Sequence, residues 1–299
     1  MEGKFELNIG KSISEFMAGV KKFRVKKLIY KSIFRGKGLE FDGYRYFEQD
    51  EDSSMIDWKA SLRSNKLLAR KYIEERDLNI YFVVDSSASM LFGSSNKLKA
   101  EYATEVISAL SYLIMDSNDN VGLFMHNEKV TKFLEPGKSK KHFFILTKFL
   151  SDVKNYGGGY SLNQTLDEVL KRIKSEFSVV ILVSDFLHLE RGIEQKLRLL
   201  SARFETFAIM IRDNLDEKLP EAGGYLLFQD PYSQKQKLVE TSVLKEKYSN
   251  FVLNQRKLLF SLFTKSNVDI CDLKTEKSFI LPLIAFLESR SNKTKGGNF

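Results

Sequence analysis

The chain of 299 residues contains 43% hydrophobic residues, 24 Phe and only 4 Pro, a composition that excludes a disordered chain and allows a sizeable core. The 47 basic and 39 acidic residues give a net charge of +8. Ten Lys or Arg and three Glu occur up to Lys37, a net charge of +7, so the rest of the chain carries 37 minus 36, or +1. A basic N-terminus therefore precedes a nearly neutral body.

The single cysteine, Cys271, excludes an internal disulfide and, without a Cys or His cluster, a zinc site of standard spacing. The N-terminus carries Glu2, Lys4 and Glu6 where a signal peptide needs apolar residues, and no window of about 18 uncharged apolar residues follows. We therefore expect a soluble, cytoplasmic protein in a reducing compartment, without a transmembrane segment.

The N-terminal segment, residues 1–77, is predicted to hold a basic helix and a connector. Apolar residues alternate with lysines over 14–35, a spacing typical of a basic amphipathic helix. Residues 36–77 are aromatic and highly charged, without clear periodicity before residue 67. We expect the helix to pack on its own domain and the connector to be ordered.

A regular alternation of strands and helices begins at residue 78. The apolar run NIYFVVD at 79–85 predicts a buried parallel strand, residues 97–115 a helix, and VGLFMH at 121–126 the next strand. This order is a βαβ unit. The elements predicted next are an edge strand at 130–134, helices at 139–152 and 161–175, and buried strands at 178–185 and 204–211.

Three apolar runs of this kind predict an α/β fold with a doubly wound, mostly parallel sheet. We assign this domain to residues 78–290, with a hairpin insertion at 225–239. The last helix is expected at 277–288, and residues 291–299 as a disordered tail.

Two predicted strands end in an aspartate, and this pattern indicates a metal site. Asp85, Ser87 and Ser89 alternate along the loop after the first strand, so their oxygens can converge, and Asp185 ends a later strand. Ligands bind beyond the carboxyl ends of parallel strands, near the point where the strand order reverses. Hydroxyl and carboxylate oxygens suit Mg²⁺ or Mn²⁺. One open coordination position would accept a carboxylate from another chain.

The alternative to a metal site is a simple Asx or Ser/Thr turn that leads into the next helix. Enzymatic interpretations fit less well. An aspartyl phosphotransferase usually needs a second acid where this chain has Ser87, and a serine hydrolase needs a base that His126, His142 and His188 do not supply in any recognisable context. We therefore expect a protein that is not an enzyme.

Six separated motifs resemble domain-of-unknown-function family 58, von Willebrand factor A-like proteins typically encoded beside MoxR-type AAA+ ATPases. The motifs are RGKGLEF at 35–41, IDWKAS at 56–61, the stretch 67–75, VVDSSASM at 83–90, the group Asp119, Val121 and Gly122, and LVSDF at 182–186. The resemblance extends to TEKSFILPLIAFLESR at 275–290. It implies a von Willebrand factor A-like fold with an N-terminal accessory segment.

By this resemblance, Asp85, Ser87 and Ser89 form the first motif of a metal-ion-dependent adhesion site, and Asp185 is its late acidic residue. The family commonly has GGTDL in its middle motif, where this chain reads GGYSL at 158–162.

Tyr160 therefore stands where the coordinating threonine is expected, and Ser161 or Thr165 is the candidate substitute. We include Ser161 in the expected ligand set.

The resemblance implies an adaptor, similar to a co-chaperone, that docks a MoxR-type AAA+ ATPase or its client through the cation. Arg35, Lys37, Asp57 and Trp58 of the family motifs are the expected partner-binding residues. A second hypothesis is a peripheral binder of anionic membranes or, less favoured, of nucleic acid, through the basic segment 21–37. A metal-dependent phosphoester hydrolase is the third.

Overall fold

The computed structural model describes residues 5–22, 41–47, 56–72, 78–175, 178–219, 224–230 and 235–295. The chain divides into two compact units, Met1–Phe34 with Leu78–Phe299 and Arg35–Asp77. This division differs from the expected N-terminal segment of residues 1–77, because helix α1 (Ile9–Lys22) packs on the large unit. Most of the basic segment 21–37 lies outside the described residues.

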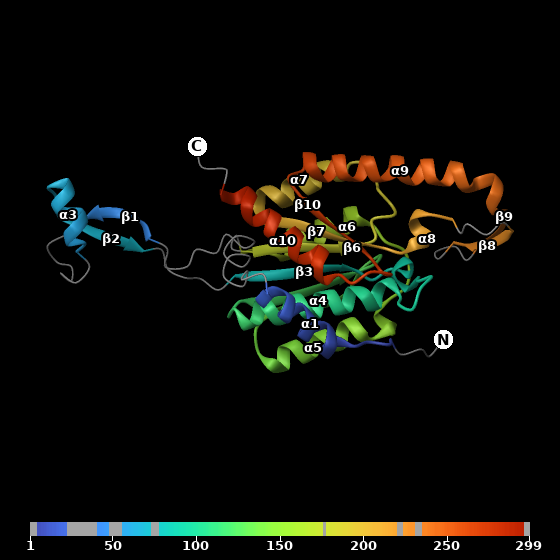
Figure 1. The fold of residues 1–299 in the computed structure, drawn as a ribbon, viewed down its shortest axis with the longest axis horizontal. Coiled ribbons are helices and arrows are strands. Elements are labelled where there is room, and N and C mark those ends of the chain that lie inside the picture. The colour runs from blue at the N-terminus through green and yellow to red at the C-terminus, as the bar shows by residue number, and fades with distance from the viewer. Residues whose placement is uncertain are drawn as a thin grey trace. The chain divides into compact units, whose positions relative to one another are not determined.

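A six-stranded sheet forms the centre of the large unit (Figure 1). Its strand order is β10-β7-β6-β3-β4-β5, in which β5 runs antiparallel to β4 and the other neighbours are parallel. The strands are β3 (Asn79–Asp85), β4 (Asn120–His126), β5 (Val130–Gly137), β6 (Ser178–Ser184), β7 (Glu205–Arg212) and β10 (Asp269–Lys274). The predicted doubly wound, mostly parallel α/β fold is confirmed.

The inner strands are apolar because helices cover both of their faces. Every residue of β6 is buried, as are all residues of β3 and β4 after the first. Packing explains the glycine at position 122 in β4, because a Cβ atom there would lie 2.6 Å from Cδ1 of Tyr81 on β3. The neighbouring Tyr81 ring thus uses the space that a side chain would need.

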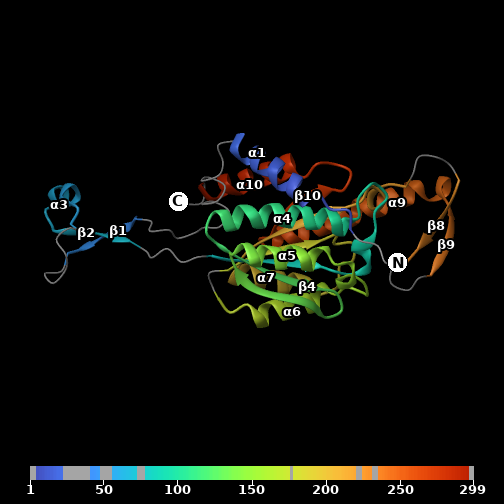
Figure 2. The ribbon, with the colours of Figure 1, turned by 90° about the horizontal axis from the view of Figure 1, so that it is seen from below.

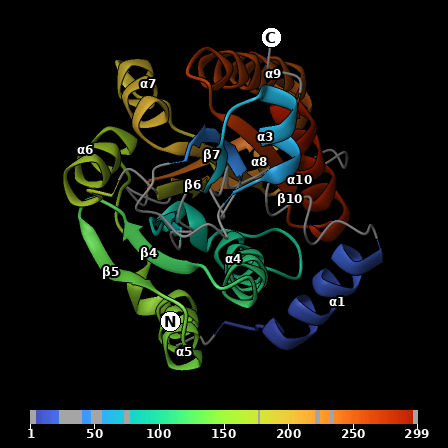
Figure 3. The ribbon, with the colours of Figure 1, turned by 90° about the vertical axis from the view of Figure 1, so that its left-hand side faces the viewer.

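Two layers of helices enclose the sheet (Figures 2 and 3). One core cluster joins the sheet to α1, α4, α5 and α10, and a second joins its other face to α6, α7 and α9. The helices are α4 (Lys99–Asp116), α5 (Lys140–Ser151), α6 (Leu162–Arg172), α7 (Ile193–Arg203), α9 (Thr241–Lys265) and α10 (Ile280–Lys295).

The C-terminal helix α10 continues past residue 290, where a disordered tail was expected. Arg290 explains the order at this point, since it is 7% exposed and forms ion pairs with Asp269 of β10 and Glu205 of β7. Residues 296–299 lie outside the described residues. Strands β8 (Tyr225–Gln229) and β9 (Gln236–Glu240) form an antiparallel pair before α9.

The small unit contains an antiparallel pair of strands and one short helix. Strand β1 (Phe41–Tyr46) pairs with β2 (Leu68–Tyr72), and α3 (Trp58–Ser64) lies between them in the sequence.

Because α1 contributes to the core, Phe16→Ala should destabilise the large unit. Phe16 is fully buried and its ring lies 6.3 Å from that of Phe279. We expect the free energy of unfolding in urea to fall by about 3–5 kcal/mol. Phe144→Ala is the matched control, since Phe144 is 67% exposed. Equal losses in the two variants would show that α1 is not part of the core.

Candidate cation site at the strand ends

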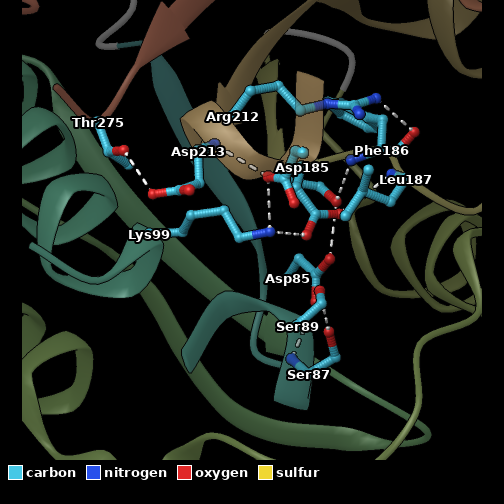
Figure 4. A network of polar contacts seen from close by, with 12 residues as sticks. Asp85, Ser87, Ser89, Lys99, Asp185, Phe186, Leu187, Arg212, Asp213 and Thr275 are labelled. Carbon is cyan, nitrogen blue, oxygen red and sulfur yellow. Dashed lines mark hydrogen bonds and ion pairs between the residues drawn. The ribbon is translucent and has the colours of Figure 1, made fainter. Parts of the chain in front are cut away.

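Two neighbouring parallel strands bring Asp85 and Asp185 to the same edge of the sheet (Figure 4). Asp85 is the last residue of β3, and Asp185 directly follows β6. Ser184 connects the strand ends, because its hydroxyl donates a hydrogen bond of 2.7 Å to Oδ2 of Asp85. Strand β3 lies between β6 and β4, where the chain connections reverse direction, so the predicted switch-point location is observed.

The turn after β3 gathers the oxygens of the DxSxS sequence. Oδ1 of Asp85 accepts a hydrogen bond of 2.9 Å from the backbone N–H of Ser87, which is the Asx turn considered as an alternative. The hydroxyl of Ser87 makes no capping bond to the following turn and forms a hydrogen bond of 3.1 Å with the hydroxyl of Ser89. Neighbouring ligands at 2.0–2.1 Å from an octahedral Mg²⁺ are about 3 Å apart. The hydroxyl spacing is therefore suited to two adjacent ligands of one ion.

The Asp85 carboxyl is buried, and the positive charge around it does not compensate the cost of ionising it. Its exposure is only 1%. Burial, and second the nearby charge of Asp185, raise the pKa of Asp85 to about 7, although hydrogen bonds from Ser184 and Ser87 oppose the shift. A bound cation would favour the ionised carboxylate and remove this penalty.

Asp185 has a buried lysine as its partner. Lys99 at the start of α4 places its ammonium 2.7 Å from Oδ2 of Asp185 and 3.0 Å from Oδ2 of Asp216 (Figure 4). Oδ1 of Asp185 accepts from the backbone N–H of Leu187 at 3.1 Å. Burial alone would raise the pKa of Asp185, but the Lys99 ammonium holds it below its ordinary value. A hydrogen bond with the Ser89 hydroxyl lowers the pKa of Asp185 further, so Asp185 is ionised and contacts the serine cluster as well as Lys99.

Lys99 and Asp216 were missed from the sequence. Asp216 lies 117 residues from Lys99, in the short helix α8 (Asn214–Glu217), so no local pattern joins them. A signal did exist, because a lysine in the first turn of a helix faces the positive end of the helix dipole. Such a residue needs an acidic partner nearby.

Arg212 adds a second buried cation next to this network. It ends β7, is 1% exposed, and donates a hydrogen bond of 3.1 Å to the carbonyl oxygen of Phe186. Burial lowers the pKa of Arg212, while Asp185 and Asp216 oppose that shift. Phe186 itself has φ of 47°, a rare conformation for a bulky residue that the arginine contact helps to hold.

The loop before α6 places Ser161 at the start of that helix. Ser161 is the N-cap of α6, and its hydroxyl accepts a hydrogen bond of 3.2 Å from the N–H of Gln164. Thr165 donates to the Ser161 carbonyl at 2.8 Å and lies 3.0 Å from Nδ1 of His126. The structure shows the Ser161 hydroxyl in a capping contact, and its ligand role stays a prediction.

Tyr160, the residue before Ser161, is close enough to Asp85 to be affected by its charge. Burial, and second the charge of Asp85, raise the pKa of Tyr160 well above its ordinary value, with a hydrogen bond to Thr165 in partial opposition. The residue that replaces the family's threonine thus lies close to Asp85.

A cleft of about 510 Å³ opens beside the cluster, between β4, β5 and α6. His126, which pairs with Asp85 across β4 and β3, lines it together with Lys129, Glu168 and Arg172. Side chains of both charges surround it. His126 is the residue of the cleft that connects it to the strand ends, since Asp85, Ser87 and Ser89 do not line it.

The structure describes two of the four predicted partner-binding residues, Asp57 and Trp58. Arg35 and Lys37 lie outside the described residues. Asp57 is 8% exposed and caps α3, since its Oδ1 accepts from the N–H groups of Lys59 and Ala60 at 3.1 Å each. The structure therefore shows a capping role for Asp57, and its partner contact stays a prediction. Trp58 is 60% exposed.

The donor set fits a hard cation only if the hydroxyls take part. Within the described ranges, no group of three or more His, Cys, Asp or Glu is placed to hold a metal ion. Asp85, Ser87 and Ser89 supply one carboxylate and two hydroxyls, which are ligands for Mg²⁺ or Mn²⁺. Asp185 lies beside these oxygens, in contact with both Lys99 and the Ser89 hydroxyl.

The raised pKa of Asp85 predicts how stability depends on pH. The folded protein holds this proton up to about pH 7 against an ordinary value of 3.8, so Asp85 stabilises the fold at low pH and this contribution is lost as pH rises through 7. In chelator, the melting temperature of the wild type should therefore fall more between these values than that of Asp85→Asn. Added Mg²⁺ at about pH 8 should raise the melting temperature of the wild type alone. Parallel curves for both proteins, with and without Mg²⁺, would contradict the assignment.

The comparisons with known proteins identify the family. The family described as "Protein of unknown function DUF58" matches residues 43–258. Uncharacterized proteins of Mycobacterium bovis and Mycobacterium tuberculosis are 22% identical over 265 residues, which is 88% of this chain and 83% of theirs. None of these names specifies a reaction.

Solved structures with a similar chain trace share little sequence with this protein. An aerotolerance-related membrane protein from Bacteroides fragilis, with multiple mutations to serines, has a TM-score of 0.47 and 15% identity over 72% of this chain and 99% of its own. The protein BatB from Bacteroides thetaiotaomicron has a TM-score of 0.45 and 14% identity over the same shares. The SpRpn10 VWA domain has a TM-score of 0.42 and 10% identity, over 70% of this chain and 94% of its own.

None of the helices in the described ranges combines the length and the apolar character that are needed to cross a lipid bilayer. The central sheet has the doubly wound, mostly parallel arrangement that the apolar runs predicted. By its family match over residues 43–258, the chain belongs to the DUF58 family of proteins of unknown function.

Proposed function

We propose that this protein is a non-enzymatic interaction module that docks a partner through a divalent cation at the ends of β3 and β6. Asp85, Ser87 and Ser89 would hold Mg²⁺ or Mn²⁺, and Asp185 would lie beside the ion. When bound, the cation would offer an open position to a carboxylate of the partner. The observation that carries this proposal is the buried, undercompensated Asp85 carboxyl beside two serine hydroxyls 3.1 Å apart.

The charge around the site supports an acidic partner group. The Asp85 carboxylate is the one ionisable ligand among the three residues, so a divalent ion held there keeps a net positive charge. The adjacent cleft gives space for the residues that flank a partner's carboxylate, and it is lined by Lys129 and Arg172 together with the acidic Glu128, Asp167 and Glu168.

The family resemblance suggests the identity of the partner, a MoxR-type AAA+ ATPase or its client. Trp58 is a second proposed contact, since it is exposed on the small unit. Arg35 and Lys37 remain predicted contacts from the same motif region.

Removing a ligand should abolish cation binding without unfolding the protein. Titration of Mn²⁺ followed by calorimetry should show affinity more than about 100-fold lower in Asp85→Asn, because even changes to residues that only support the ligands cost roughly 10- to 100-fold. Ser161→Ala is the matched control. It should keep the wild-type affinity and lose about 1 kcal/mol of stability, because Ser161 caps α6. Equal affinity in Asp85→Asn would reject the site.

Docking should depend on the same ion. Purified MoxR-type ATPase should bind the wild type in Mg²⁺, and this binding should be lost in chelator or with Asp85→Asn. Binding that persists in chelator would show that the contact does not use the cation. Hydrolysis of a phosphoester that is lost in Asp85→Asn would favour the hydrolase hypothesis instead.

A further inference from the structure

The small unit contains a pocket of its own, of about 450 Å³. Tyr44 of β1, Leu68 of β2 and the side of α3 that carries Lys59 and Arg63 line it. Its volume is within the range of roughly 300–1,000 Å³ that is typical of binding pockets. The helix and the strand pair of the small unit thus leave room between them for a side chain of another molecule.

Two cationic side chains in this pocket have no ion-pair partner among the described residues. Lys59 and Arg63 are four residues apart on α3, so they lie on the same side of the helix, and both are exposed. Asp57 is the one acid in the lining. Its Oδ1 caps α3, and its Oδ2 accepts a hydrogen bond of 3.4 Å from the Tyr44 hydroxyl. The pocket therefore offers positive charge to an anionic group.

Large apolar side chains surround these cations. Trp58 and Leu62 are exposed and four residues apart on α3. Tyr44 and Tyr46 are also exposed, and they are two residues apart on β1, so they share one face of the strand pair. The Lys66 ammonium donates a hydrogen bond of 3.0 Å to the Tyr46 hydroxyl. Trp, Tyr and Arg are the residues that contribute most to binding in protein interfaces.

The charge and the apolar groups of this surface indicate the chemistry of its partner. Every exposed charged side chain that the structure describes in the small unit is a cation, namely Lys59, Arg63 and Lys66. A surface with charges of one sign favours a partner of the opposite sign. Leu62 and Leu67 are exposed as well. These aliphatic groups favour protein side chains over nucleotide bases, which stack on aromatic rings.

We infer that the small unit carries a second docking site, where an acidic segment of a partner protein places a carboxylate against Lys59 and Arg63. The guanidinium of Arg63 can hold a carboxylate with two parallel N–H donors, and the Lys59 ammonium adds a further charged donor. Apolar side chains of the same segment pack on Trp58 and Leu62. No residue of the cation site takes part, so this site goes beyond the proposed function and works without a metal ion.

The test uses the full chain and two labelled peptides, one of alternating Glu and Leu and one of alternating Gln and Leu. Fluorescence anisotropy should show that the wild type binds the Glu peptide roughly tenfold or more tightly than the Gln peptide, because only the Glu peptide supplies charged acceptors. The difference should shrink as salt is added. Trp58 is the single tryptophan of the chain, so the intrinsic emission should also change on binding.

Variants locate the binding within the chain. Lys59→Gln with Arg63→Gln should lower the affinity for the Glu peptide roughly tenfold or more. Lys247→Gln with Lys257→Gln is the matched control, since it removes the same charge from exposed positions of α9. This control should bind the Glu peptide as the wild type does.

Equal affinities of the wild type for the two peptides would overturn the inference, and this comparison does not depend on the folding of any variant. Equal affinities of the two double variants would also overturn it. Tighter binding of an oligothymidylate than of the Glu peptide would assign the surface to nucleic acid instead. Chelator and Asp85→Asn should leave the Glu peptide bound, and loss of binding in either would place the peptide at the cation site. Failure to bind Mn²⁺ alone would reject only the proposed function.

Discussion

The crowding of carboxylates at one edge of a parallel sheet is the constraint on which this structure depends. Parallel strands place their carboxyl ends together, so Asp85 and Asp185 meet at neighbouring strand ends even though about a hundred residues separate them in the sequence. Both are buried, and two buried carboxylates that lie close together cannot both ionise without compensation. The ammonium of Lys99 compensates the charge of Asp185. No such cation compensates Asp85, whose pKa is raised.

That asymmetry connects the fold to the proposed function. Helix α4 packs between the sheet and α1, so its first residue is fixed relative to the ends of β3 and β6. One strand end therefore carries an internal cation, and the other offers oxygens without one. We propose that these oxygens recruit an external ion and, through it, an acidic partner.

The sequence predicted the features that follow from periodicity and from strand-end geometry. Apolar runs predicted β3, β4, β6 and β7, and the shared edge of parallel strands predicted that Asp85 and Asp185 meet. Contacts between distant segments could not be predicted, such as Lys99 with Asp216 or Arg290 with Glu205. The amphipathic pattern of α1 indicated a buried face but not the unit that buries it. The serine after GGY indicated a hydroxyl ligand, and the structure adds that this serine is the N-cap of α6.

The central claim is that Asp85, Ser87 and Ser89 hold one hard cation while Asp185 stays with Lys99. The most direct measurement is the anomalous difference map of crystals grown with Mn²⁺. We predict a single peak about 2 Å from an Asp85 carboxylate oxygen and from both serine hydroxyls, with the Lys99–Asp185 ion pair intact. A map without a peak among these oxygens, in crystals where the strand ends are well ordered, would contradict the claim.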